Sequence, residues 1–177
     1  MLFRSGWGYA TVVYSEIQPD RANAWKDGVI GLTLAPGQTE PHSDEWGTIS
    51  AWSWGISRII DYFETDKSVD AKRVAIQGFS RLGKTVLWAG ARDTRVAAVF
   101  SGCAGELGSA LARRDWGETV DDMKDFARPD RSLLIKKRGK SCRTMHTCTG
   151  VTASIHLSPV RIIFSKKSQP VHRWPRY

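Results

Sequence analysis

Cysteine is scarce in this sequence. Among 177 residues only Cys103, Cys142 and Cys148 occur, and no two of them have CxxC spacing. This pattern argues against a disulfide framework and against a zinc site. No run approaches the roughly 20 consecutive apolar residues that a membrane-spanning helix needs, and no charged, apolar, small-residue leader follows Met1. We therefore expect no membrane span.

Acidic residues are almost absent from the last 51 positions, where Asp130 stands alone against 12 lysines and arginines. The preceding 126 residues carry a net charge of −3, so the whole excess behind the formal net charge of +8 lies in this tail. A basic, Ser/Thr-rich tail could bind phosphates of a nucleic acid. Its short apolar runs and few glycines instead favour a disordered segment or one translated out of frame. We predict a folded domain over 1–126 and an irregular tail over 127–177.

The first 126 residues alternate between strand and helix patterns. Strands are predicted over 9–14, 74–77 and 94–100, a helix over 45–64 capped by Ser43 or Asp44, and a second helix over 82–92. A long Gly- and Pro-rich loop separates the first strand from the first helix. This alternation predicts an α/β fold with a parallel sheet and flanking helices. Because the chain opens almost directly on a strand, we expect it to be part of a longer protein.

The most informative motif lies between the second strand and the second helix. Gly78, Ser80, Gly83, Lys84 and Thr85 fit two different sites. A small residue two before a serine, between strand and helix, is typical of a nucleophile elbow. The same letters satisfy Gly-x-x-x-x-Gly-Lys-Thr, a phosphate-binding P-loop, which would make the chain a nucleotide-binding protein.

Neither interpretation follows from the motif alone. A P-loop enzyme needs an acidic residue after a neighbouring strand to hold magnesium, yet the next strand ends in Ser101-Gly102-Cys103. The elbow of most esterases has a glycine two after the serine, where this chain has Leu82. A third possibility is that Ser80 merely caps the helix.

The wider chain resembles the glucuronoyl esterase family, its bacterial branch especially. The elbow letters Gly78-Phe79-Ser80-Arg81-Leu82-Gly83-Lys84 match that family's Gly-x-Ser-Arg-x-Gly-Lys, and the resemblance covers about residues 9–123. It includes Pro19-Asp20-Arg21, Trp46–Gly55, Val69–Val74, Leu87–Ala91 and Leu111–Val120. The resemblance implies a partial α/β-hydrolase fold and a serine carboxylic-ester hydrolase that cuts glucuronoyl esters between xylan and lignin. It implies no metal or organic cofactor, a carbohydrate ester as partner rather than nucleic acid or membrane, a monomer, and a secreted or periplasmic parent protein.

The resemblance also assigns roles. Ser80 would be the nucleophile, Arg81 would lie beside the oxyanion hole, and Lys84 and Glu118 would contact the sugar. By its local pattern alone, Arg81 is equally consistent with a surface arginine in the first turn of a helix, and the spacing of Glu118 favours a solvated helix charge.

The remaining catalytic groups depart from the family pattern. Part of the family has its catalytic acid 23 residues after the serine, where this chain has Cys103; Glu106 is the nearby substitute. No histidine is nominated, because His42 precedes the serine and His146, His156 and His172 lie in the unmatched tail. We therefore expect the chain by itself to be inactive.

Overall fold

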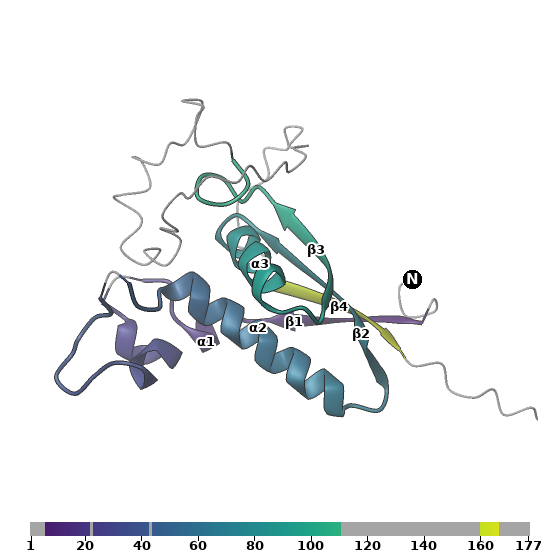
Figure 1. The fold of residues 1–177 in the computed structure, drawn as a ribbon, viewed down its shortest axis with the longest axis horizontal. Helices are drawn as coiled ribbons and strands as arrows, with labels where there is room; N and C mark the ends of the chain where they lie inside the picture. The colour runs from purple at the N-terminus through teal and green to yellow at the C-terminus, as the bar shows by residue number, and fades with distance from the viewer. Residues whose placement is uncertain (1–5, 22, 43, 111–159, 167–177) are drawn as a thin grey trace, which may run out of the picture.

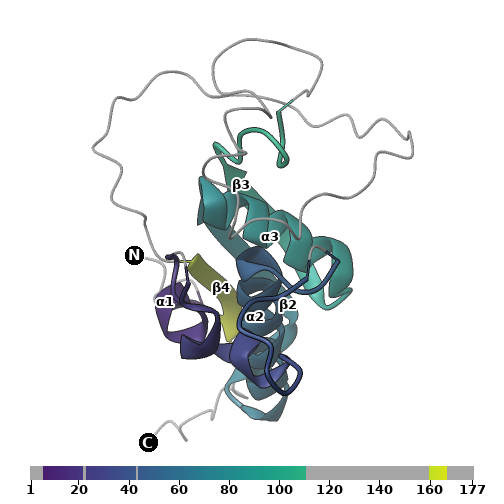
Figure 2. The same ribbon diagram turned by 90° about the vertical axis from the view of Figure 1, so that its left-hand side faces the viewer.

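A computed structural model describes residues 6–21, 23–42, 44–110 and 160–166. Within these ranges the chain forms one four-stranded sheet, covered on one face by two long helices (Figures 1 and 2). The elements in chain order are β1 (Trp7–Val12), α1 (Tyr14–Ile17), η2 (Trp25–Asp27), η3 (Val29–Leu32), α2 (Thr48–Thr65), β2 (Val69–Phe79), α3 (Arg81–Arg92), β3 (Val96–Gly102) and β4 (Val160–Lys166), of which η2 and η3 are short 3₁₀ helices.

The sheet has the order β1-β4-β2-β3. β2 and β3 pair in parallel, as the α/β pattern predicts, with Ile76 opposite Val99. β4 runs antiparallel to both of its neighbours, so that Ile162 stands between Ala10 on β1 and Ile76 on β2. The sheet is therefore mixed: the predicted parallel pairing is present between β2 and β3, whereas β4 departs from it.

β4 comes from the segment predicted to be an irregular tail. Residues 160–166 instead form an inner strand, and Val160 and Ile162 are buried. The physical reason is local composition: Val160, Ile162, Ile163 and Phe164 are β-branched or aromatic residues that favour a pleated, half-buried surface. The rest of 127–177 lies outside the described residues.

The core lies between the sheet and the helix pair. Helix α2 buries the apolar stripe expected from its three- and four-residue spacing, with Ile59 partly buried at its margin; the buried members are Ile49, Trp52, Ile56, Ile60 and Phe63. Val74 and Ile76 from β2 and Leu82 and Val86 from α3 complete this core. The expected caps do not form: Gly47 occupies the N-cap position of α2 and makes no side-chain cap, Asp44 precedes it, and Ser43 lies outside the described residues.

The long loop after β1 is anchored through Gln18, which is almost fully buried. Its side-chain amide donates to the carbonyl of Ala24 at 2.8 Å and accepts from the N–H of Ile30 at 3.1 Å. Its own carbonyl accepts the indole N–H of Trp52 at 2.8 Å. Because buried polar groups need such partners, Gln18 fixes the loop's path against α2, and this path determines where Asp20 lies.

Candidate active site

The turn from β2 into α3 holds Ser80 in an uncommon backbone conformation. Its φ of 57° and ψ of −124° lie outside the regions that L-residues ordinarily occupy. The N–H of Ser80 donates to the carbonyl of Gly102 at 2.9 Å, and its carbonyl accepts from Lys84 N–H at 3.1 Å. The residue is therefore held from both sides, by the end of β3 and by the first turn of α3.

Two glycines make this turn possible. A Cβ at Gly78 would collide with the carbonyl oxygen of Leu82 and lie 2.6 Å from its carbonyl carbon. A Cβ at Gly83 would lie 2.7 Å from the carbonyl oxygen of Gly102. Gly83 thus permits α3 to pack on the end of β3, while Leu82 turns into the core. This packing explains why the second glycine stands three residues after the serine in this chain.

Arg81 is tethered by an aspartate from the loop after β1. Its Nη1 lies 2.6 Å from both carboxylate oxygens of Asp20. Burial raises the pKa of Asp20 above its usual value, and the Arg81 guanidinium partly opposes this increase. About a third of the Arg81 side chain is exposed, and a guanidinium has five N–H donors. Arg81 can therefore keep this ion pair and still donate toward a ligand beside Ser80.

The P-loop interpretation does not fit this geometry. A P-loop directs backbone amides, a lysine and a hydroxyl toward phosphate. Here the N–H of Ser80 is bonded to Gly102 and that of Lys84 to Ser80. The hydroxyl of Thr85 donates to the Arg81 carbonyl at 3.0 Å, and both Lys84 and Thr85 are buried. Two of the backbone amides and the Thr85 hydroxyl are thus engaged within the fold.

The structure brings together three of the four predicted site residues, since Ser80, Arg81 and Lys84 share one turn. Glu118 lies outside the described residues, as do His146, His156 and His172. His42 lies in an exposed loop, where its backbone N–H donates to Glu45. The assigned catalytic and sugar-binding roles therefore stay predictions.

The loop after β3 packs directly against the elbow. Cys103 has a positive φ of 43° and is exposed, whereas Glu106 is only 3% exposed. One carboxylate oxygen of Glu106 has no hydrogen-bond partner within the part of the chain that the structure describes. Sequence reasoning proposed Glu106 only by its proximity along the chain and could not foresee this burial.

Sequence reasoning missed the contact between Asp20 and Arg81. Asp20 belongs to the Pro19-Asp20-Arg21 segment that resembles the glucuronoyl esterases, but no spacing connects it to residue 81. The described ranges contain no group of three or more His, Cys, Asp or Glu side chains arranged for a metal. Nor does any helix there have the length and apolar content needed to cross a bilayer.

A serine in this uncommon backbone conformation, between a parallel strand and a helix of an α/β sheet, has the backbone geometry that is typical of a nucleophile elbow. Residues 41–127 match the family described as glucuronyl esterase, fungi. This chain therefore carries a segment of a glucuronoyl esterase domain, as the resemblance over residues 9–123 predicts.

Individual relatives agree with this assignment. Carbohydrate esterase MZ0003, from an unknown prokaryotic organism, is 50% identical over 115 residues, which are 65% of this chain and 26% of the relative. A 4-O-methyl-glucuronoyl methylesterase of Wolfiporia cocos is 32% identical over 126 residues, or 67% of this chain and 30% of the relative. The chain thus spans about a quarter to a third of the length of these two relatives.

Solved structures resemble the same region. A glucuronoyl esterase from Solibacter usitatus is 48% identical with a TM-score of 0.60, covering 63% of this chain and 29% of that protein. A CE15 glucuronoyl esterase from Teredinibacter turnerae is 37% identical with a TM-score of 0.59, covering 63% and 26% respectively.

Proposed function

We propose that the protein to which this segment belongs is a serine carboxylic-ester hydrolase acting on glucuronoyl esters of lignocellulose. The observation that carries the proposal is the backbone of Ser80, held in the left-handed region between Gly78 and Gly83 with Arg81 beside it. The names of the relatives, glucuronoyl esterase and 4-O-methyl-glucuronoyl methylesterase, support this substrate class. The described sheet would then be one part of an α/β-hydrolase sheet.

The reaction would follow the acyl-transfer scheme of serine hydrolases. The hydroxyl of Ser80 attacks the acyl carbon of the uronic ester, and its proton passes to a base outside the described residues. The Arg81 backbone N–H and guanidinium would stabilise the negative charge that develops on the carbonyl oxygen. The alcohol leaves, and water then releases the uronic acid from Ser80.

Substrate binding would use the neighbouring polar side chains. Lys84, one turn after the nucleophile, would contact ring hydroxyls, and Glu118 would contribute a second contact. We place the parent protein outside the cytoplasm, where plant cell-wall material is found, and expect it to act as a monomer without a metal or organic cofactor.

A fluorophosphonate probe tests the nucleophile. It should label the chain at Ser80, or label a chimera in which residues 124–177 are replaced by the corresponding part of a glucuronoyl esterase. Ser80→Ala is the matched control and should remove the label. The chimera should also release benzyl alcohol from a benzyl glucuronate ester. Absence of labelling in both proteins would overturn the proposal.

A further inference from the structure

A groove of about 410 Å³ lies between the outer faces of α2 and α3. Neither Ser80 nor Arg81 lines it. Trp88 of α3 lines the groove. It is eight residues beyond Ser80, or roughly 12 Å along the helix axis. The groove is therefore separate from the nucleophile elbow, and its volume falls in the range of small-molecule binding sites.

Aromatic rings form part of its wall. Trp46 and Trp54 are 40% and 39% exposed, and their ring centroids lie 6.5 Å apart. The guanidinium of Arg58 lies 5.5 Å from the centre of the Trp54 ring, and that of Arg92 lies 5.4 Å from the centre of the Trp88 ring. Such cation–π contacts hold the indoles in place, so the groove presents ordered aromatic surface to a ligand.

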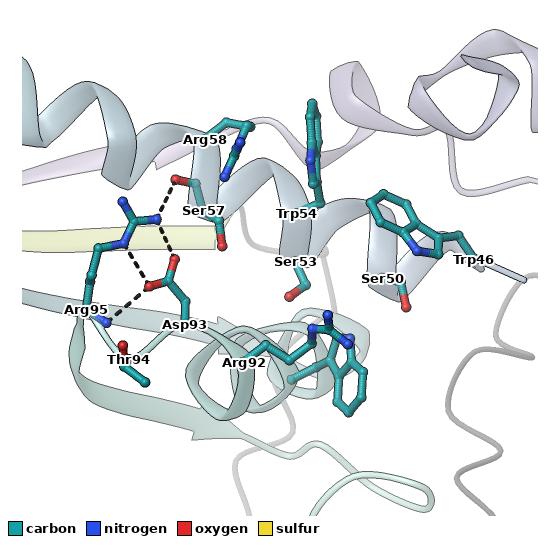
Figure 3. A pocket seen from close by; sticks show the side chains of 11 residues that line it. Trp46, Ser50, Ser53, Trp54, Ser57, Arg58, Arg92, Asp93, Thr94 and Arg95 are labelled. Atoms are coloured by element: carbon teal, nitrogen blue, oxygen red, sulfur yellow. Dashed lines mark hydrogen bonds and ion pairs between the residues drawn. The ribbon is translucent and has the colours of Figure 1, made fainter. Parts of the chain in front are cut away.

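Hydroxyl groups form the rest of the α2 wall. Ser50, Ser53 and Ser57 recur at three- and four-residue steps and therefore share one face of the helix. Figure 3 shows Ser50 and Ser53 pointing from α2 toward the α3 side of the groove. Each hydroxyl can donate and accept hydrogen bonds. Aromatic surface alternating with hydroxyls is complementary to a sugar, which has apolar ring faces and polar edges.

The charges favour a ligand with a single carboxylate. Arg58 pairs with Asp61 at 3.1 Å, and Arg95 pairs with Asp93, Asp61 and Glu64, each at 2.8 Å. Arg92 forms no ion pair with any residue that the structure describes, and its guanidinium lies over the Trp88 ring. It is an exposed cation whose planar guanidinium matches a carboxylate.

We propose that this groove is a second binding site, which takes an acidic glycan with its rings against Trp46 and Trp54 and its carboxylate on Arg92. An apolar protein segment would cover the Ser50 hydroxyl and the Arg92 charge without offering them polar partners, which is unfavourable. A nucleic acid needs a basic track along its phosphates, whereas Asp93 lines this groove and the lining residue Arg95 is already paired with Asp61, Glu64 and Asp93. Using glucuronic-acid-bearing xylan as the first probe rests on the proposed function.

Calorimetric titration of the full chain tests the site. The probes are a xylo-oligosaccharide bearing one 4-O-methyl-glucuronic acid, the neutral xylo-oligosaccharide of the same length, an oligogalacturonate and a single-stranded DNA. We expect the acidic xylo-oligosaccharide to bind roughly tenfold more tightly than the neutral one, the effect of one charge-assisted hydrogen bond. Arg92→Ala should remove this preference. Trp54→Ala or Trp46→Ala should lower the affinity for both the acidic and the neutral xylo-oligosaccharide.

Arg73→Ala is the matched control, because it removes an exposed arginine that lies 5.6 Å from the Trp7 ring outside the groove. It should leave all affinities unchanged, and circular dichroism verifies that each variant is folded. The proposal is overturned if neither acidic glycan binds, if binding survives both tryptophan variants, or if DNA is preferred. Ser80→Ala should bind glycans like the parent chain, so failure of the esterase proposal and failure of this site give different results.

Discussion

Arg81 and Asp20 form an ion pair 61 residues apart in sequence, with Nη1 of the arginine 2.6 Å from both carboxylate oxygens. The pair joins the loop after β1 to Arg81, the first residue of α3. Only about a tenth of the Asp20 side chain is exposed, so water screens the interaction less than at an ordinary surface ion pair. The orientation of Arg81 therefore depends on the same loop that Gln18 anchors.

Asp20→Asn should change how stability depends on pH. Burial raises the pKa of Asp20 in the folded state above its unfolded value, so the folded chain binds the proton more tightly. Its stabilising contribution is complete below the unfolded pKa and is lost as the pH rises through the folded pKa. The free energy of unfolding of the parent chain minus that of Asp20→Asn should thus fall as the pH rises above the ordinary carboxyl pKa and through the folded-state pKa of Asp20, as measured by urea titration. A difference that rises with pH would contradict this expectation.

Asp93→Asn should show the opposite trend. Hydrogen bonds from Arg95 lower the pKa of Asp93 to about 2, so the carboxylate stabilises the fold above its unfolded pKa. This contribution is lost as the pH falls toward 2, and it amounts to at most about 2 kcal/mol. The same urea titrations measure it, and the two aspartates act as controls for each other because their slopes have opposite signs.

Gly78→Ala should displace the elbow. The new Cβ would collide with the carbonyl group of Leu82, and such overpacking costs roughly 1–3 kcal/mol. Because Ser80 lies between these residues, its labelling by fluorophosphonate in the chimera should also fall. Gly37→Ala is the comparison: φ there is +85°, with nothing within 4 Å of the added carbon. It should lower stability through backbone strain and leave the labelling rate unchanged.

Ile162→Ala tests whether β4 belongs to the core. Ile162 is fully buried between β1 and β2, so truncation should destabilise the chain by about 2–5 kcal/mol. Arg161→Ala changes the neighbouring exposed position of the same strand. Its free energy of unfolding should stay within about 0.5 kcal/mol of that of the parent chain. Equal effects in thermal or urea unfolding would mean that β4 does not pair as described.

The helices were predictable because their apolar spacing is regular. Residues 45–64 and 82–92 were predicted to be helical, against Thr48–Thr65 and Arg81–Arg92 in the structure. The cap was not predictable, because Ser43 and Asp44 are favourable capping residues by type but the helix begins after Gly47. Tertiary packing of Ile49 and Trp52 determines where the first turn starts.

The strands were predictable in part. β2 was expected over 74–77 and extends over Val69–Phe79, since Asp70 and Lys72 are polar residues that no local pattern assigns to a strand. β4 was missed because the basic composition around it outweighed its short apolar run. A strand of this kind is recognised only when the sheet supplies partners on both sides.

The candidate site also has features that the sequence predicts and features that it does not. The positions of Ser80 and Gly78 followed from a local pattern, since strand, turn and helix are contiguous. The partner of Arg81 and the burial of Glu106 did not, because both depend on how distant loops pack. The groove between α2 and α3 likewise requires Trp46 and Trp54 to meet Trp88 and Arg92 across two helices.

The antiparallel pairing of β1 with β4 joins segments about 150 residues apart. At roughly 5–20 residues per second, the ribosome would release the last of these residues about 8–30 s after the first. During that interval the opening strand has no described neighbour in the sheet, and its unpaired amides are open to other chains. Productive folding of a nascent chain therefore depends on keeping Trp7–Val12 from pairing with other chains until Val160–Lys166 has been synthesised.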